Sequence, residues 1–417
     1  MIKSDRLCRI MIKDIKTRIS KLNIDFDFEA YWEIIYLILL AFFVGMRFLL
    51  STMFTIYWPK YFYRTLTVIG VVLVLLHLMM AKDISKKEIA AMLVVTFVFM
   101  MSHYVSRYDF LVDLLILILG AYRVNFRNIL KTYIAVWSVL LVVTIIGAMT
   151  GLAENLVYYQ GEGGERVRMA LGICYPTDLA AYVAFLMFAY VCVRDEYITY
   201  LEIGVMAALA VAVFYITDAR TDFIVMTALL CMVFAAKRFQ KEFYKLLKKQ
   251  FIWVICMGLP IIFGIVTFGL SKSFSYDNIF LTSLDAKMSG RISLGEWALR
   301  DYPIKAFGQY VLEKGAGGSS DISDFYFFID SSYLSIIIKY GIIFFVVLWI
   351  QTVHTAKMVE RNKQYFSAIV LIMIFIQSIM EHHYIQYWFN PFILFVFAKY
   401  NSVNQITENK QDVFNLN

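Results

Sequence analysis

Four short clusters of charged residues separate long apolar runs, and arginine is prominent in them. In chain order they contain Arg166 and Arg168; Arg220 within TDARTD at 217–222; Arg291 and Arg300 ahead of Asp330; and Glu381, His382 and His383. The guanidinium group of arginine is a planar fork that suits phosphate oxygens and stays charged. A carboxylate beside it can accept a proton during a transfer reaction. The pattern therefore indicates a site for a phosphate or pyrophosphate next to a general base.

Each cluster also has a purely structural interpretation. Arg166 alone reads as an exposed loop cation, and Arg220 between two aspartates reads as half of an ion pair. Asp330 suits a helix N-cap, a position that aspartate favours. His382 and His383 suit an interfacial position. Arginine is costly near lipid and tends to face a protein interior or a wet cavity, so several clusters on one side of a membrane favour the functional interpretation.

The composition excludes most soluble classes. The chain has 417 residues, of which 61% are hydrophobic and 17% charged, whereas soluble domains have about 45–50% apolar and about 25% charged residues. The five cysteines form no CxxC pair, and no nucleotide-binding P-loop occurs. A net charge of +7 without a soluble domain gives no reason to expect a nucleic-acid partner. The sequence predicts an all-α integral membrane protein.

About twelve apolar runs define the predicted organisation. They lie at 33–50, 64–81, 88–102, 109–121, 130–150, 170–193, 197–216, 222–236, 251–270, 329–350, 365–380 and 385–398. Residues 1–32 form a basic segment, predicted as an amphipathic helix on the cytoplasmic leaflet or as a solvated tail. Nine transmembrane helices are predicted in 33–270, a large extracytoplasmic loop in 271–328, three more helices in 329–398, and a cytoplasmic tail in 399–417.

The distribution of basic residues predicts the orientation. With the N-terminus inside and alternating spans, 25 of the 39 lysines and arginines fall on the cytoplasmic side, as the positive-inside rule requires. Both termini are then cytoplasmic, and the four charged clusters share the outer face. Within the large loop, residues 290–300 are predicted to form a short helix.

The clusters suggest a reaction that needs no cofactor or metal. A sugar on a lipid pyrophosphate already carries a good leaving group, so its transfer needs cations for the departing pyrophosphate and one base. The sequence has no HExxH motif. On a helix, the consecutive Glu381, His382 and His383 would splay around the axis, which argues against a metal site.

The motifs and their order resemble those of the O-antigen polymerase and ligase superfamily, most closely its capsular and exopolysaccharide polymerase (Wzy-like) branch. The similar elements are Arg168 followed by LGICYPTDLAAY; the TDARTD turn with Arg220; SGRISLGEWAL at 289–299 with Arg291; AFGQY at 306–310; DSSYLSIIIKYG at 330–341; and Glu381 with NPF at 390–392. They span roughly residues 130–398. The chain has Asp330 where ligases of the superfamily have histidine, which makes a ligase the less favoured member.

The resemblance implies a GT-C-like membrane fold and a polymerase that joins oligosaccharide repeat units carried on polyprenyl pyrophosphate. It implies a bacterial cytoplasmic membrane, with a flippase and a chain-length regulator as partners. Arg168, Arg220 and Arg291 would hold pyrophosphate, and Asp330 would be the base, with Glu381 or His382 as second choices. The other predicted substrate-binding residues are Arg166, Arg300, Trp297, Tyr310 and His383. A flippase for lipid-linked saccharides and an O-antigen-type ligase are the alternatives.

Overall fold

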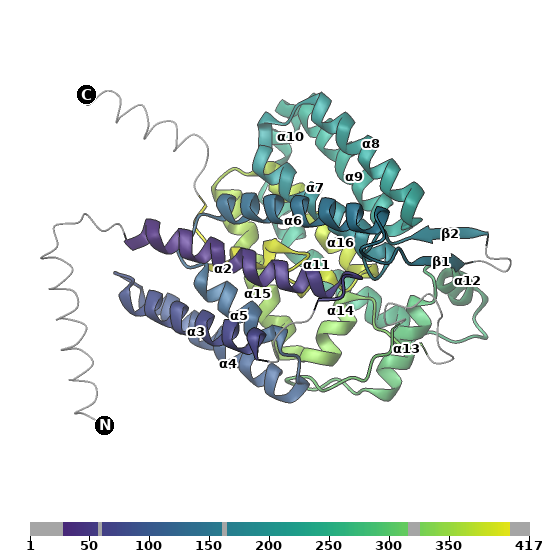
Figure 1. Ribbon diagram of the computed structural model, residues 1–417, viewed down its shortest axis with the longest axis horizontal. Coiled ribbons are helices and arrows are strands. Elements are labelled where there is room, and N and C mark those ends of the chain that lie inside the picture. The colour runs from purple at the N-terminus through teal and green to yellow at the C-terminus, as the bar shows by residue number, and fades with distance from the viewer. Residues whose placement is uncertain (1–27, 57–60, 161–164, 316–325, 401–417) are drawn as a thin grey trace, which may run out of the picture.

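The computed structural model describes residues 28–56, 61–160, 165–315 and 326–400. The predicted N-terminal amphipathic helix, most of the C-terminal tail and the glycines of 161–164 and 316–318 lie outside this part of the chain. Its α-helices are α2 (Phe28–Leu50), α3 (Phe62–Met80), α4 (Lys86–Ser106), α5 (Phe110–Gly120), α6 (Phe126–Met149), α7 (Pro176–Arg194), α8 (Tyr200–Thr217), α9 (Arg220–Arg238), α10 (Gln240–Leu247), α11 (Gln250–Lys272), α12 (Ile279–Lys287), α13 (Arg291–Asp301), α14 (Ser332–Ser335), α15 (Ile342–Arg361) and α16 (Tyr365–Met380) (Figure 1).

Long apolar helices dominate the described residues, as the composition predicts. Eight of them are long and apolar enough to cross a membrane, namely α2, α3, α4, α6, α7, α8, α11 and α15. Two shorter apolar helices, α5 and α16, accompany them. Many of the large apolar side chains on α3, α4 and α8 are exposed, which is the surface expected of helices that face lipid. The structure is therefore an all-α protein with the features of a multi-pass membrane protein.

The run at 329–350, predicted as one span, is broken. It forms α14, a π-helical stretch η2 (Ile336–Tyr340) and α15, and the break falls at Gly341, whose φ is 98°. Backbone from the preceding loop packs into this break: the N–H of Gln309 donates to the carbonyl of Lys339 at 3.0 Å. A Cβ on Gly341 would lie 2.3 Å from the carbonyl oxygen of Ala306, so only glycine fits there.

The last predicted span, 385–398, forms no α-helix. Two short 3₁₀ helices replace it, η3 (His383–Ile385) and η4 (Pro391–Phe397). Pro391 cannot donate a backbone hydrogen bond, and the side chain of Asn390 accepts the N–H of Phe392 at 3.0 Å and so caps η4. The segment packs against α5, α6 and α15 inside the bundle.

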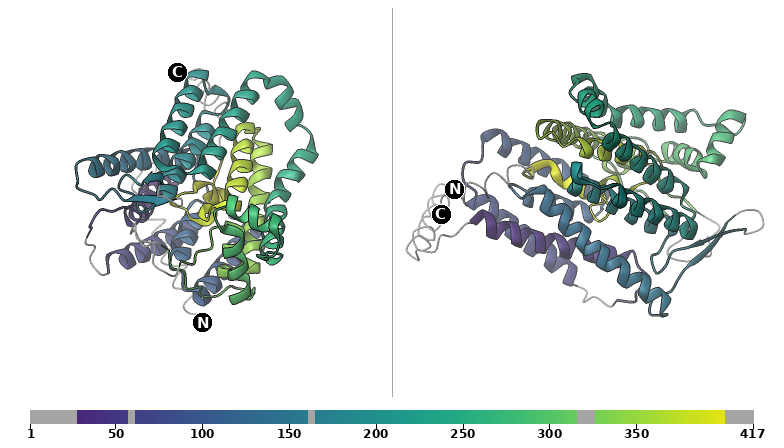
Figure 2. Two further views of the ribbon diagram at one scale, coloured as in Figure 1. Left: turned by 90° about the vertical axis from the view of Figure 1, so that its right-hand side faces the viewer. Right: turned by 90° about the horizontal axis from the view of Figure 1, so that it is seen from above.

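Helix α7 lies at the centre of the core. Of the residues in its most apolar 18-residue window, 72% are buried, a larger share than in any other membrane-length helix of the described residues. The helix packs against α6, α8, α9 and α16 (Figures 1 and 2). Its Tyr182 stacks on Phe389 of the C-terminal segment with ring centroids 4.1 Å apart, and Trp137 of α6 meets Tyr182 edge-on. The C-terminal segment is therefore anchored to the central helix.

A two-stranded hairpin and two short helices gather at one end of the bundle, which we call the hairpin end (Figures 1 and 2). Strands β1 (Val157–Gln160) and β2 (Arg166–Met169) are antiparallel, with Tyr158 opposite Arg168. Helices α12 and α13 belong to the predicted large loop. This end carries the charged clusters found in the sequence.

Candidate functional site

A cavity of about 370 Å³ lies at the hairpin end. Residues from six separate segments line it: the hairpin, the start of α7, the turn between α8 and α9, the start of α13, the chain just before α14, and the chain just after α16. The charged residues among them are Arg166, Arg168, Asp218, Arg220, Asp222, Arg291, Asp330 and Glu381. Seven of the predicted site residues, including His382, therefore meet in one place.

Two arginines reach the cavity from β2 because alternate residues of a strand point to the same side. Arg166 forms an ion pair with Asp218, and the Nε of Arg168 donates to the carbonyl of Thr217 at 2.8 Å. The interpretation of Arg166 as an exposed loop cation is wrong. Burial, and then the neighbouring Arg166, lower the pKa of Arg168, so an added anion there would be favoured.

The turn between α8 and α9 presents Arg220. Asp218 adopts a left-handed conformation with φ 46° and ends α8, and α9 begins at Arg220. The Nε of Arg220 lies 3.8 Å from Asp218, and its side chain is 65% exposed. This pairing is loose, so Arg220 has the most freedom of the four arginines to contact a ligand.

Arg291 lies deeper and is held firmly. Gly290, with φ 78°, turns the chain into α13, and the carboxylate of Asp285 accepts the N–H groups of Ile292 and Ser293. The Arg291 side chain is 14% exposed. Its Nη2 lies 3.0 Å from Glu381 Oε1, its Nε donates to the Met380 carbonyl at 2.7 Å, and its Nε lies 3.6 Å from Asp330 Oδ2. Burial opposes the charge, but Glu381 and Asp330 raise the pKa of Arg291.

Asp330 faces the cavity from the chain ahead of α14. The N-cap of α14 is Ser331, so the helix-capping interpretation of Asp330 is wrong. Burial raises the pKa of Asp330, and the positive charge of Arg291 opposes this rise. A carboxylate with a raised pKa is a better proton acceptor than an ordinary exposed aspartate.

Three residues of this region were missing from the predicted site. Asp222 lines the cavity wall, and its Oδ1 accepts a 2.6 Å hydrogen bond from Gln377. Tyr326 lines the cavity beside Asp330, and burial raises its pKa. Asp178 lies behind them, 3.9 Å from His383. Asp222 and Asp178 stand in motifs that the sequence already singled out, but nothing in the sequence marks Tyr326.

Four predicted substrate-binding residues lie outside this cavity. Arg300 pairs with Glu296 and Asp301 on the exposed face of α13. Trp297 packs 4.9 Å from Phe327, and its indole N–H donates to Asp301. Tyr310 is 54% exposed and lies near Tyr108. His383 is buried, with its Nδ1 3.0 Å from Gln386 Oε1. The sequence placed these residues near the site but did not predict which way their side chains face.

Glu381, His382 and His383 offer ligand atoms that all lie within 4.8 Å of one another. The sequence argument against a metal here assumed a helix, and that assumption is wrong because α16 ends at Met380. The three are the residues of the described chain that would hold a divalent ion. Arg291 contacts the same carboxylate, so a dication would have to lie beside a guanidinium group, which is electrostatically unfavourable.

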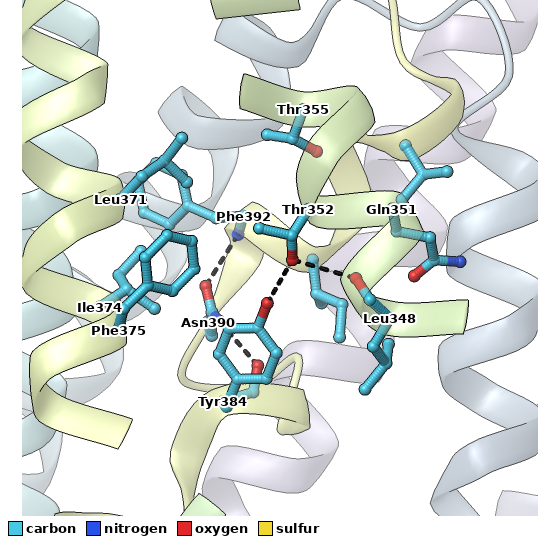
Figure 3. A pocket seen from close by; sticks show the side chains of 12 residues that line it. Leu348, Gln351, Thr352, Thr355, Leu371, Ile374, Phe375, Tyr384, Asn390 and Phe392 are labelled. Carbon is cyan, nitrogen blue, oxygen red and sulfur yellow. Dashed lines mark hydrogen bonds between the residues drawn. The ribbon is translucent and has the colours of Figure 1, made fainter. Parts of the chain in front are cut away.

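A second, smaller cavity lies between α15, α16 and the C-terminal segment (Figure 3). Its volume is about 30 Å³, enough for one or two water molecules. Tyr384 and Thr352 share a 2.7 Å hydrogen bond there, and Asn390 donates to the Tyr384 carbonyl at 2.7 Å (Figure 3). The lining is otherwise largely apolar, so this cavity supports the irregular C-terminal segment rather than a reaction.

The larger cavity brings four arginines, which can bind oxyanions, together with the partly exposed carboxylate of Asp330, which can accept a proton. Comparison with known proteins adds no assignment: no family model, no curated protein and no solved structure matches the chain. A functional assignment for this chain therefore rests on the fold and the cavity alone.

Proposed function

We propose that this protein is a membrane glycosyltransferase that polymerises oligosaccharide repeat units carried on polyprenyl pyrophosphate. The observation that carries the proposal is the meeting of Arg168, Arg220, Arg291 and Asp330 in one cavity. Those are the residues chosen from the sequence for pyrophosphate binding and proton transfer. We further propose that the chain crosses the bacterial cytoplasmic membrane about twelve times, if the shorter helices and the irregular segments are counted, with both termini cytoplasmic and the hairpin end outside.

In the proposed reaction, a hydroxyl oxygen of the acceptor repeat unit attacks the anomeric carbon of the donor glycan. The bond from that carbon to the phosphate oxygen breaks, and polyprenyl pyrophosphate leaves with the electron pair. The acceptor proton passes to the Asp330 carboxylate. Arg168, Arg220 and Arg291 stabilise the leaving pyrophosphate, since cations placed where negative charge develops are usually the largest contribution to such a transfer.

The position of the cavity favours an enzyme over the flippase alternative. Transporters place their substrate site near the middle of the membrane, between repeated halves. Here the cavity is lined by the hairpin and by the starts of α9 and α13, all at one end of the bundle (Figure 1). A substrate whose glycan projects out of the membrane would reach this end.

A reconstitution tests the proposal. Purified protein in lipid vesicles receives a lipid-linked repeat unit from its source strain, without nucleotide sugars or ATP, and the products are separated on a gel. We expect a ladder spaced by one repeat unit, and no ladder from the matched Asp330→Asn protein. Movement of the unit across the bilayer without a ladder would identify a flippase, and transfer to a lipid A-like acceptor would identify a ligase.

A further inference from the structure

A buried ion pair lies beside Asp330 and takes no part in the contacts described so far. Lys339 belongs to the π-helical stretch η2 and is 4% exposed. Its Nζ lies 2.5 Å from Glu313 Oε2, and the Glu313 side chain is 14% exposed. Buried charges of this kind are costly to desolvate, and a π-helical stretch is often found at a functional site.

Glu313 connects this pair to the segment that carries Asp330. Its second oxygen, Oε1, accepts the N–H of Ile329 at 3.0 Å, and Ile329 directly precedes Asp330. Lys314 and Phe327 exchange two backbone hydrogen bonds of 2.9 and 3.1 Å. Val311, Phe327 and Ile329 pack in one apolar cluster with α13. The carboxylate of Glu313 thus fixes the backbone on which Asp330 stands.

Among the described residues, aromatic rings also lie close to the ammonium group of Lys339. Its ammonium group lies over the ring of Phe328 at 5.3 Å and over that of Tyr108 at 5.9 Å. Both members of the pair also act on Asp330 through charge: Glu313 raises the pKa of Asp330 and Lys339 lowers it. The other charged or titratable groups that face Asp330 are Arg291 of α13, Tyr326, Glu381 and Asp178.

We propose that the Lys339–Glu313 pair is a positioning device for the general base: Glu313 anchors the backbone ahead of Asp330, and Lys339 cancels the charge of Glu313. This inference rests on the proposed function, in which Asp330 accepts the proton of the acceptor hydroxyl. It assigns a role to Lys339, which lies in the 330–341 motif without a predicted function, and to Glu313, which no motif in the sequence had marked.

The pH dependence of polymerisation tests the pair. We expect the polymerisation rate of the wild-type protein to rise with pH as Asp330 loses its proton, which gives the pH profile an acid limb. Glu313→Gln keeps the acceptor for Ile329 but leaves Lys339 uncompensated, so the limb should move to lower pH by about one unit. The double variant Glu313→Gln/Lys339→Met is neutral again and should return the limb to its wild-type position.

The controls separate this inference from the proposed function. Lys339→Arg keeps the charge and should leave the limb in place. If the wild-type protein forms a ladder but the acid limb of Glu313→Gln is not shifted, the positioning role is overturned and the proposed function stands. A double variant whose limb stays shifted like that of Glu313→Gln would also overturn the positioning role. Absence of a wild-type ladder would reject the proposed function itself. If Glu313→Gln fails to fold, Lys339→Gln serves instead: its limb should move to higher pH, and an unmoved limb would reject the pair.

Discussion

Replacement of Arg291 by alanine should destabilise the protein as well as stop polymerisation. The guanidinium group neutralises Glu381, whose side chain is 4% exposed, and lies 3.6 Å from Asp330. Removal of one partner of a buried pair typically costs about 3–5 kcal/mol, because the other charge is left uncompensated. The loss of the 2.7 Å hydrogen bond to the Met380 carbonyl leaves a further buried acceptor without its donor.

A double variant separates the contribution of the Arg291 charge to stability from its contribution to the reaction. Arg291→Met/Glu381→Gln removes both charges and keeps side chains of similar length, so most of the stability lost in Arg291→Ala should return. Polymerisation should stay absent, because no cation then faces the pyrophosphate from α13. Arg291→Lys keeps a charge but loses the planar fork, and its turnover should fall about 10²–10³-fold, as for loss of one well-placed donor.

Thermal unfolding in detergent gives the stability, and the ladder from lipid-linked substrate gives the turnover. We expect low stability for Arg291→Ala, near wild-type stability for the double variant, and no ladder from either. An Arg291→Ala protein that unfolds at the wild-type temperature would show that Glu381 is neutral without its partner. A double variant that forms a normal ladder would remove Arg291 from the reaction altogether.

Two further variants probe the support of the site. Gly341→Ala should lower the unfolding temperature, at a cost of about 1–3 kcal/mol, because φ is 98° and the new Cβ would lie 2.3 Å from the Ala306 carbonyl; an unchanged midpoint would show that this backbone relaxes freely. Trp297→Phe should leave the ladder intact while stability falls slightly, since Trp297 packs on Phe327 and lies outside the cavity lining; loss of the ladder in a stable protein would restore Trp297 to the substrate site.

The helical class was predictable because apolar runs of membrane length have few other structures available. The breaks in these runs were not. Gly341 is one glycine within an apolar stretch, and its role depends on backbone from residues 305–309 that packs against it. The final run was predicted as a span because most of its residues are apolar. Asn390 and Pro391 were visible there, yet their effect depends on a cap that only the folded chain shows.

The sequence indicated which residue types would line the cavity more clearly than it indicated where each residue would lie. Seven of the residues named from the arginine and carboxylate clusters line one cavity, because charge inside an apolar protein needs a wet or paired environment. The hairpin that carries Arg166 and Arg168 was missed, although the alternation Arg-Val-Arg is the period of a strand. The surroundings of Asp330 could not be predicted from its neighbours in sequence, because its ion-pair partner, Arg291, belongs to another element.

Some charged side chains of the cavity are firmly held by their partners, and others are exposed and loosely paired. Four arginines and four carboxylates line it, so the protein charges alone balance and a pyrophosphate must compete with the carboxylates for its cations. Arg291 is 14% exposed and held between Glu381, Asp330 and a backbone carbonyl, whereas Arg220 is 65% exposed and lies 3.8 Å from Asp218. Release of Arg220 from Asp218 costs little, because an exposed ion pair contributes only about 0–1 kcal/mol. Under the proposed function, we therefore expect Arg220 to make the first contact with an incoming pyrophosphate, while Arg291 keeps the carboxylates of the inner wall in place for the transfer.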